Sequence, residues 1–178
     1  MFAMRGLAAL VIGLCVLSTS AARAEQWFRE HNDAHLALQA GAWDSGVFGN
    51  ASRRSAGFGA EYRFGAHLWM VHPFIGLNAT SRGGIYGYGG ILFDVSVIDR
   101  LWFTPSFAVG GYHRGSGRNI GSVIEFRSAL ELSYEFSNKS RLGVRFEHLS
   151  NAGISSTNPG MENFWLVYSV PVSNLFGK

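Results

Sequence analysis

The sequence predicts an all-β fold, an eight-stranded antiparallel transmembrane β-barrel of the outer membrane. Three observations support this prediction. Segments of roughly ten residues alternate between apolar and polar side chains, as strands with two different faces do. The composition is rich in glycine and aromatic residues, with 23 Gly, 14 Phe and only 15% charged residues. Finally, the connections between the segments alternate between short and long, which is typical of outer-membrane barrels.

The N-terminus reads as a secretory signal peptide over residues 1–24. A short basic start at Met1–Arg5 precedes an apolar run at Gly6–Leu17, and small residues then lead to a cleavage site after Ala24. The apolar run is too short to span a bilayer. We therefore expect a single barrel domain over residues 25–178, which lacks the chain's one cysteine, Cys15, and so has no disulfide.

The charge of the mature chain excludes an electrostatic argument for nucleic-acid binding. Removal of Arg5 and Arg23 leaves 13 basic residues against 12 acidic ones, a net charge of +1. The expected mature chain also contains no run of 18 consecutive apolar residues, so we expect no helical membrane span.

Eight strands are expected after a short amphipathic start at Gln26–Asn32. Their ranges are Asp33–Trp43, Ser55–Phe64, Leu68–Thr80, Ile85–Ile98, Leu101–His113, Ser122–Phe136, Arg141–Ser150 and Glu162–Val172. The clearest is Ser122–Phe136, which places large apolar side chains on one face. These are Ile124, Phe126, Leu130, Leu132, Tyr134 and Phe136. The opposite face carries charged and small residues, so the two faces have different surroundings.

The connections give the orientation of the barrel. Tight turns are expected at Gly65–His67, Asp99–Arg100 and Ser137–Ser140, and generally longer loops at Asp44–Arg54, Ser81–Gly84, Arg114–Gly121 and Asn151–Met161. Short turns face the periplasm in such barrels, so the strand Arg141–Ser150 ends at the cell surface. About eight strands form a barrel that side chains fill, so we expect no open pore.

A soluble eight-stranded barrel, such as a lipocalin, is the alternative. Such a barrel would carry its charges outside and its bulky apolar residues inside. Here one strand face combines charges of both signs with Gly, Ala and Ser, as a narrow lumen with internal ion pairs requires. The expected lumen charges, to which we assign a structural role, are Glu61, Arg63, Glu125, Arg127, Glu131, Arg145 and Glu147. The other face is a nearly continuous apolar band, which favours contact with lipid.

A candidate catalytic group lies at the outer end of the last two strands. His148 and Ser150 are two residues apart and therefore share a strand face, the lipid-facing one. The hairpin that follows brings Glu162 alongside His148. A serine hydroxyl needs a neighbouring base to become a nucleophile, and the base works best when a third group orients it. The three residues supply these roles, and Asn151 and Gly153 follow as candidate donors to an oxyanion.

Spacing alone leaves a plainer interpretation open. A histidine and a serine two residues apart occur often near strand ends, and an interfacial histidine can simply anchor a barrel. The position at a lipid boundary favours function, because polar groups there are costly.

The same residues resemble a known family. His148-x-Ser150-Asn151-Ala152-Gly153, followed by Asn158-Pro159-Gly160-x-Glu162 and a closing Y-x-x-P-V, is similar to the PagL-type lipid A 3-O-deacylases. The resemblance is sharp over residues 141–172 and looser before them. It implies an eight-stranded outer-membrane enzyme that hydrolyses the ester at the 3-position of lipid A without a cofactor. It further implies Ser150 as the nucleophile, His148 as the general base and acid, and Glu162 as the group that orients His148.

Arginines in or beside the outer loops are candidates for binding the phosphates of lipid A, or else ordinary solvated loop charges. They are Arg53, Arg54, Arg82, Arg114 and Arg118. The histidines outside the candidate group lack metal-ligand spacing, so we expect no metal site. They are His31, His35, His67, His72 and His113.

The expected function is therefore that of a serine esterase acting on lipid A in the outer leaflet of the outer membrane. Two alternatives remain open, namely a phospholipid esterase and a non-enzymatic structural or adhesive barrel. The expected partner is lipopolysaccharide, with no nucleic acid. The sequence does not determine the oligomeric state, and a homodimer is among the open possibilities.

Overall fold

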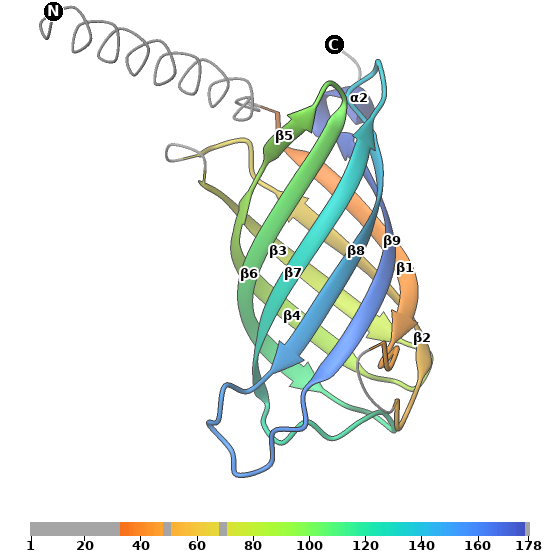
Figure 1. The fold of residues 1–178 in the computed structure, drawn as a ribbon, viewed down its shortest axis with the longest axis vertical. Coiled ribbons are helices and arrows are strands. Elements are labelled where there is room, and N and C mark those ends of the chain that lie inside the picture. The colour runs from red at the N-terminus through yellow and green to blue at the C-terminus, as the bar shows by residue number, and fades with distance from the viewer. Residues whose placement is uncertain (1–32, 48–50, 68–70, 177–178) are drawn as a thin grey trace, which may run out of the picture.

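The protein forms a closed barrel of antiparallel strands in the computed structural model, which describes residues 33–47, 51–67 and 71–176 (Figure 1). The elements are β1 (His35–Trp43), β2 (Ser55–Arg63), β3 (Val71–Thr80), β4 (Ile85–Phe93), β5 (Val95–Ile98), β6 (Leu101–His113), β7 (Ile124–Glu135), β8 (Arg141–Ser150), β9 (Met161–Pro171) and the short helix α2 (Val172–Phe176). Among the described residues, no helix is long and apolar enough to cross a membrane.

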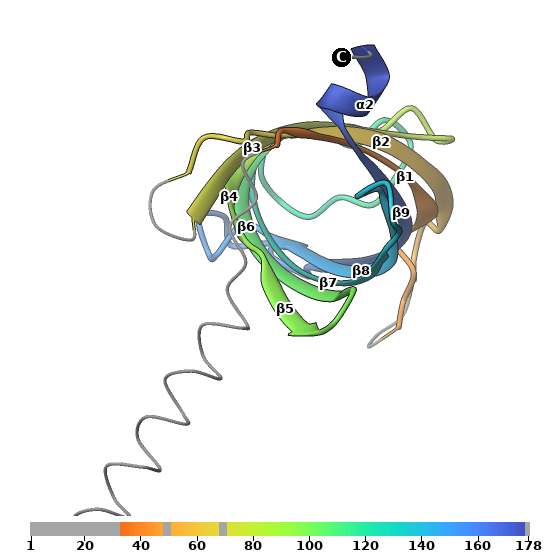
Figure 2. The same ribbon diagram turned by 90° about the horizontal axis from the view of Figure 1, so that it is seen from above.

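Two pairings close the barrel. β1 pairs with β9, and β4 pairs with β6, so the sheet has no free edge along most of its height. Seen along the barrel, the strands form a continuous ring (Figure 2). The long connections lie at one end, opposite the end where α2 and the start of β1 lie (Figure 1).

The expected strand Ile85–Ile98 is interrupted at Asp94, which corrects the sequence prediction. β4 and the first half of β5 pair with β6 in one register, with Leu92 opposite Ser106 and Val95 opposite Phe103, before a register shift between Ser96 and Ile98. The break therefore lies opposite residues 104–105, where Pro105 has no N–H to give to a ladder. Asp94 uses its carboxylate to accept hydrogen bonds from Thr104 Oγ1 (2.6 Å) and Arg141 Nη1 (2.9 Å). β4 and β5 thus form one broken strand, and the prediction of an eight-stranded barrel is confirmed.

Other strand ends differ by one to three residues. The expected strand Ser122–Phe136 is Ile124–Glu135, and the strand expected at Glu162–Val172 is Met161–Pro171, because Val172 begins α2. The signal peptide expected at residues 1–24, the start at Gln26–Asn32 and residues 68–70 lie outside the described residues.

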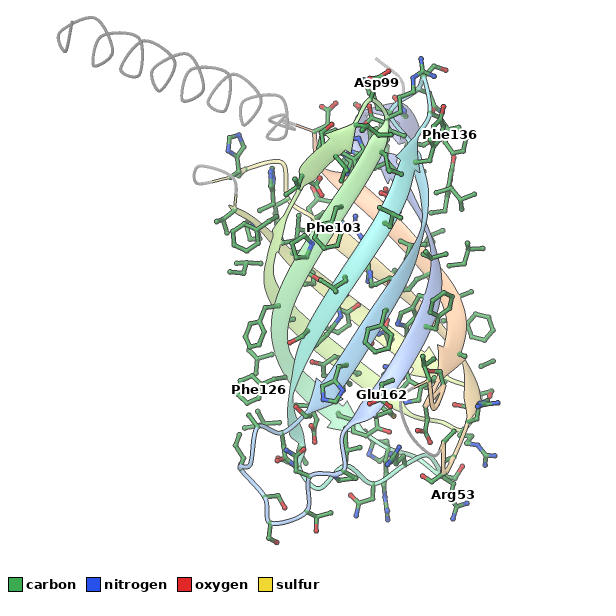
Figure 3. All side chains as sticks on the ribbon, viewed as in Figure 1. Arg53, Asp99, Phe103, Phe126, Phe136 and Glu162 are labelled. Atoms are coloured by element: carbon green, nitrogen blue, oxygen red, sulfur yellow. The ribbon has the colours of Figure 1, made fainter. Side chains whose placement is uncertain are left out.

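Large apolar side chains cover the outside of the barrel (Figure 3). Those exposed along β7 and β8 are Ile124, Leu130, Leu132, Tyr134, Leu142 and Val144. An exposed apolar surface of this extent is what contact with the hydrocarbon core of a membrane requires. The soluble alternative is therefore wrong, because it would place these residues inside.

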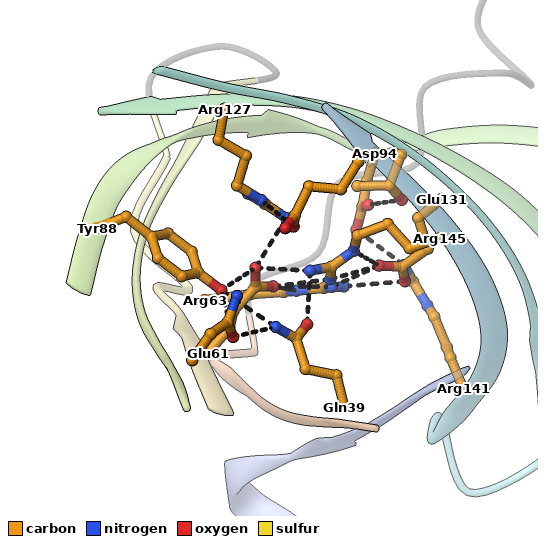
Figure 4. A network of polar contacts seen from close by, with 12 residues as sticks. Gln39, Glu61, Arg63, Tyr88, Asp94, Arg127, Glu131, Arg141 and Arg145 are labelled. Carbon is orange, nitrogen blue, oxygen red and sulfur yellow. Dashed lines mark hydrogen bonds and ion pairs between the residues drawn. The ribbon is translucent and has the colours of Figure 1, made fainter. Parts of the chain in front are cut away.

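Charged side chains of both signs fill the middle of the lumen (Figure 4). Arg145 pairs with Glu61 and with Glu131 at 2.7 Å each, and Arg63 also pairs with Glu131 at 2.7 Å. A buried charge is tolerated only when it is paired and hydrogen-bonded, and these groups meet that condition.

A further arginine, Arg127, extends the lumen network toward the outer loops. Arg127 binds Glu147 at 2.6 Å and Glu61 at 3.0 Å. The predicted network is thus confirmed for Glu61, Arg63, Arg127, Glu131, Arg145 and Glu147. It is wrong for Glu125, which is buried but accepts its hydrogen bond from Ser122 N (3.3 Å), because Arg127 is already engaged by the other two carboxylates.

Candidate active site

His148 and Glu162 face each other directly across β8 and β9. The imidazole Nδ1 lies 3.4 Å from Glu162 Oε1, and the two side chains are 43% and 17% exposed. Glu162 lies near the end of the barrel that carries the long loops (Figure 3). A carboxylate in this position favours the tautomer with a proton on Nδ1, which leaves Nε2 free to accept a proton.

Ser150 is the last residue of β8 and shares the outward face of His148, two residues away. Its side chain is partly exposed, and its partner across β7 is Phe126. Within the described part of the chain, no hydrogen bond joins the Ser150 hydroxyl to His148. Catalytic hydrogen bonds are often long in unliganded sites and shorten when substrate binds. The lack of a hydrogen bond between Ser150 and His148 is therefore compatible with a nucleophile and its base.

Sequence reasoning missed Ser128. It lies on β7 directly opposite His148, so that His148 has Ser128 on one side and Glu162 on the other. Ser128 is exposed on a face that is otherwise large and apolar. This interruption of the apolar face was the available signal, because hydroxyl groups are uncommon on a lipid-facing surface.

Gly160 lies against the imidazole and was also missed as a site residue. Its backbone has φ of +62°, and a β-carbon at this position would lie 2.8 Å from His148 Cε1 and 3.3 Å from Nε2. The lack of a side chain therefore makes room for the ring. The left-handed conformation is itself one that glycine adopts most readily.

The first outer loop holds the backbone of Glu162. Ser45 donates to the carbonyl of Glu162 twice, from its N–H at 2.7 Å and from its hydroxyl at 3.0 Å. The neighbouring Asp44 N–H donates to Asn163 Oδ1 at 2.9 Å. These bonds attach the loop after β1 to the start of β9 and so position the residue that faces His148.

Asn151 is buried, and its amide is fully used by the surrounding loops. Nδ2 donates to the carbonyls of Ile120 (2.8 Å) and Thr157 (2.9 Å), and Oδ1 accepts from the N–H of Gly153 (3.0 Å). Both candidate oxyanion donors, Asn151 and Gly153, thus have other acceptors in the absence of substrate. Their expected role stays a prediction, and it requires these bonds to be shared or exchanged when an oxyanion forms.

The five candidate arginines divide into two groups. Arg118 Nη1 pairs with Asp44 at 2.9 Å, Arg54 Nη2 donates to the Ser45 carbonyl at 2.6 Å, and Arg82 Nε donates to the Arg54 carbonyl at 3.1 Å. These three stabilise the outer loops. The guanidinium groups of Arg53 and Arg114 make no hydrogen bond or ion pair within the described ranges, and both residues are exposed.

Aromatic side chains border the site on the lipid-facing surface. Phe126, opposite Ser150, stacks on Phe107 with ring centroids 6.0 Å apart. Phe146, two residues before His148, lies opposite Phe164 on β9. A hydrocarbon chain can lie along such a surface while its polar end reaches the hydroxyl of Ser150. In the ranges that the structure describes, no three His, Cys, Asp or Glu side chains form a metal site.

Comparisons with known proteins agree with this geometry. A protein "Lipid A deacylase PagL" of Pseudomonas aeruginosa is 36% identical over 59 residues, which are 33% of this chain and 34% of that protein. A protein with the same name from Bordetella bronchiseptica is 36% identical over 52 residues, 29% of each chain. Each alignment thus spans about a third or less of the relative's length.

Two solved structures show the same fold. The crystal structure of the outer membrane enzyme PagL matches with a TM-score of 0.60 at 20% identity, over 78% of this chain and 99% of that one. A structure from the de novo design of transmembrane β-barrels matches with a TM-score of 0.56 at 11% identity, over 81% of this chain and 98% of that one. The model of the family described as lipid A 3-O-deacylase (PagL) matches residues 18–171. Because this match covers most of the chain, the protein belongs to the lipid A 3-O-deacylase (PagL) family.

Proposed function

We propose that the protein is an outer-membrane serine esterase that removes the acyl chain ester-linked at the 3-position of lipid A. The observation that carries this proposal is the placement of His148 on the lipid-facing surface, directly opposite Glu162 and on the same face as Ser150. Residues 1–24 would direct export and be removed. Membership of the deacylase family supports the same reaction.

The first half of the reaction transfers the acyl group to the enzyme. Ser150 Oγ attacks the carbonyl carbon of the ester while His148 Nε2 takes the hydroxyl proton. The carbonyl π bond opens to a tetrahedral oxyanion. When that intermediate collapses, the bond to the sugar oxygen breaks, and His148 gives its proton to that oxygen. The products of this half are a free sugar hydroxyl and an acylated Ser150.

The second half releases the fatty acid. A water molecule attacks the acyl carbonyl while His148 takes one of its protons, and the new intermediate collapses with return of that proton to Ser150 Oγ. Glu162 remains ionised throughout, accepts a hydrogen bond from Nδ1–H and stabilises the imidazolium. The residues needed for these steps are all on this chain.

The membrane supplies the substrate from the side. The filled lumen offers no route to Ser150, whereas the outward face of β8 opens to lipid. The apolar surface around Phe126 and Phe146 would hold the departing chain, and lipopolysaccharide in the outer leaflet would present its ester bonds near the outer end of β8.

The test compares two serines that both flank His148. Ser150→Ala and Ser128→Ala are each made in the full-length protein, and folding is checked by the shift in electrophoretic mobility on heating. We expect Ser150→Ala to abolish loss of the 3-linked acyl chain from lipid A, measured by mass spectrometry, and Ser128→Ala to retain most of it. A fluorophosphonate probe should label the peptide that contains Ser150.

The two other functions give different results in the same experiment. A phospholipid esterase would release fatty acid from phospholipid vesicles that lack lipopolysaccharide, and would leave lipid A unchanged. A non-enzymatic barrel would give identical lipid profiles for wild type and Ser150→Ala. Activity that survives Ser150→Ala but not Ser128→Ala would assign the nucleophile to β7 and overturn our assignment.

A further inference from the structure

We propose that a pocket in the loop after β6 binds a phosphate-bearing sugar of the substrate, with Arg114 as its main contact. This inference rests on the proposed function and extends it from the acyl chain to the headgroup. We call this site the outer pocket and define it by Tyr112, His113, Arg114, Asn119, Gly121 and Ser122.

The outer pocket has the size of a small-molecule site. Its volume is about 480 Å³. Ligand pockets commonly measure about 300–1,000 Å³, which leaves room here for a phosphorylated sugar but not for a whole lipid. The pocket therefore suits one end of a large substrate.

Hydrogen-bond donors dominate the polar groups of the outer pocket. Asn119 Oδ1 accepts from the N–H of Gly121 (3.1 Å), which uses the amide's acceptor and leaves its NH₂ group to donate. Ser122 Oγ likewise accepts from the N–H of Ile124 (3.1 Å), and its own O–H stays available. Donors without competing acceptors are what a phosphate requires, because its oxygens only accept at neutral pH.

Arg114 differs from the neighbouring arginine of the same loop. Arg118 is used internally, by its 2.9 Å pair with Asp44. Arg114 lies at the pocket, is exposed, and its guanidinium has no ion pair or hydrogen bond within the described ranges. None of the residues that line the pocket is acidic. The carboxylate of Glu125 accepts a hydrogen bond from Ser122 N (3.3 Å) but is buried and does not line the pocket. The exposed guanidinium of Arg114 can bind phosphate oxygens in pairs.

The outer pocket is in contact with the loop between β8 and β9. A β-carbon on Gly121 (φ of +101°) would collide with the carbonyl oxygen of Thr157 and lie 3.0 Å from Asn151 Nδ2. The same loop receives a hydrogen bond from Asn151, at the carbonyl of Ile120. Because Asn151 directly follows Ser150, one wall of the pocket packs against the segment that carries the nucleophile.

The depth of the pocket fits the arrangement of such a substrate. β6 ends at His113, and the pocket lies at and beyond that end, whereas Ser150 ends its own strand with Phe126 as its neighbour. By register, Phe126 pairs with Val109, four residues before His113. At roughly 3.3 Å per residue, His113 lies about 13 Å farther along β6 than Val109, and the strand tilt of about 40° makes the rise along the barrel axis smaller. The pocket therefore lies on the outer side of Ser150, as a sugar headgroup does relative to an ester at the membrane boundary.

The experiment measures kinetics on three substrates with purified full-length protein in detergent. The substrates are phosphorylated lipid A, the same lipid A after chemical dephosphorylation, and a p-nitrophenyl ester without a headgroup. The variants are Arg114→Gln and Asn119→Asp, which keeps the acceptor for Gly121 N–H but places a negative charge in the pocket. Arg100→Gln removes an exposed arginine from a periplasmic turn and is the matched control.

We expect both pocket variants to raise the apparent KM for phosphorylated lipid A by roughly tenfold, the effect of losing one charge-assisted hydrogen bond. kcat should change less than about twofold, because the reacting atoms are untouched. Dephosphorylated lipid A and the p-nitrophenyl ester should be hydrolysed as by wild type, and Arg114→Lys should restore part of the affinity. Arg100→Gln should match wild type on all three substrates.

Three outcomes distinguish a failure of the outer pocket from a failure of the proposed function. An unchanged KM for phosphorylated lipid A in both variants, with normal hydrolysis, overturns the pocket alone. Equal increases in KM with and without phosphates also overturn it, because the pocket would then recognise something other than phosphate. Absence of hydrolysis of every ester by folded wild type would instead overturn the proposed function.

Discussion

Gly160 leaves room for the imidazole of His148 because it has no side chain. A β-carbon at this position would lie 2.8 Å from the imidazole Cε1. The edge of the ring that lies there also carries Nε2, the nitrogen that must receive the proton of Ser150. The other ring nitrogen, Nδ1, faces Glu162. The position of the base is thus defined at both nitrogens by Gly160 and Glu162, which lie in the connection after β8 and on β9.

Gly160→Ala should therefore slow the chemical step. The added methyl group displaces the imidazole, and we expect kcat to fall by roughly tenfold or more, because small misplacements of a catalytic group are costly. Gly83→Ala is the matched control, since Gly83 also has a positive φ (+72°) but nothing within 4 Å of its β-carbon. Both variants carry similar backbone strain. An equal loss of activity in the two would show that strain, not contact with the ring, is responsible.

Glu162→Gln should lower kcat and leave KM nearly unchanged. The amide can hold the ring but does not stabilise an imidazolium, and it can select the wrong tautomer, so we expect a decrease of roughly a hundredfold or more. The measurement is steady-state kinetics on lipid A in detergent micelles. Asp99→Asn, in the exposed turn between β5 and β6, controls for loss of a carboxylate. A kcat equal to that of wild type would remove Glu162 from the mechanism.

Asn151→Ala should loosen the loop between β8 and β9. The change removes the bonds to the Ile120 and Thr157 carbonyls and the acceptor of the Gly153 N–H, each worth about 1 kcal/mol. Hydrogen exchange should accelerate over residues 151–160. Asn158→Ala is the matched control, because its side chain only accepts from Asn151 N (3.1 Å). Unchanged exchange together with lost acylation of Ser150 would instead support the oxyanion role of Asn151.

Glu61→Gln should destabilise the barrel as a whole. Three arginines (Arg63, Arg127 and Arg145) pair with this one buried carboxylate, and its neutralisation leaves their charges without full compensation. Breaking a buried pair costs about 3–5 kcal/mol, which urea unfolding in detergent can measure. A change below about 0.5 kcal/mol, the value expected for an exposed substitution such as Asp99→Asn, would contradict the importance of the network.

The free-energy cost of an arginine substitution on the outer surface should depend on its depth in the membrane. Leu130 lies in the middle of β7 and is exposed, so Leu130→Arg should cost about 2–4 kcal/mol in a bilayer. Phe136 lies just beyond the end of β7. Phe136→Arg should cost only about 0–1 kcal/mol. Folding into lipid vesicles of fixed thickness measures the difference. Equal costs at the two positions would argue against lipid around the middle of β7.

Much of the barrel could be predicted because the side-chain period of a strand is fixed at two. Charges and large apolar residues separate cleanly along β7 and β8, which gives both the strands and their inner and outer faces. The break at Asp94 could not be predicted this way. It depends on Arg141, 47 residues later in the chain, which the closed barrel brings within 2.9 Å.

The sequence predicted where the candidate catalytic residues lie better than it predicted the contacts around them. The shared face of His148 and Ser150 and the approach of Glu162 follow from parity and one hairpin, and the structure confirms both. The roles of these residues stay predictions. The hydrogen bonds of Asn151 could not be predicted from the sequence, because its partner Ile120 lies in a different loop. Ser128 and Gly160 were missed because their relation to His148 depends on strand register and on the path of one loop.

The ion pairs inside the barrel also act as a test of correct assembly. Glu61, Glu131 and Arg145 come from β2, β7 and β8, so Arg145 reaches both carboxylates only when strands far apart in the chain have met in one alignment. A slip of a single residue would turn these groups toward hydrocarbon and leave apolar side chains in the interior. Misaligned barrels are therefore disfavoured energetically, and the aligned wall keeps His148 opposite Glu162 on its outer surface.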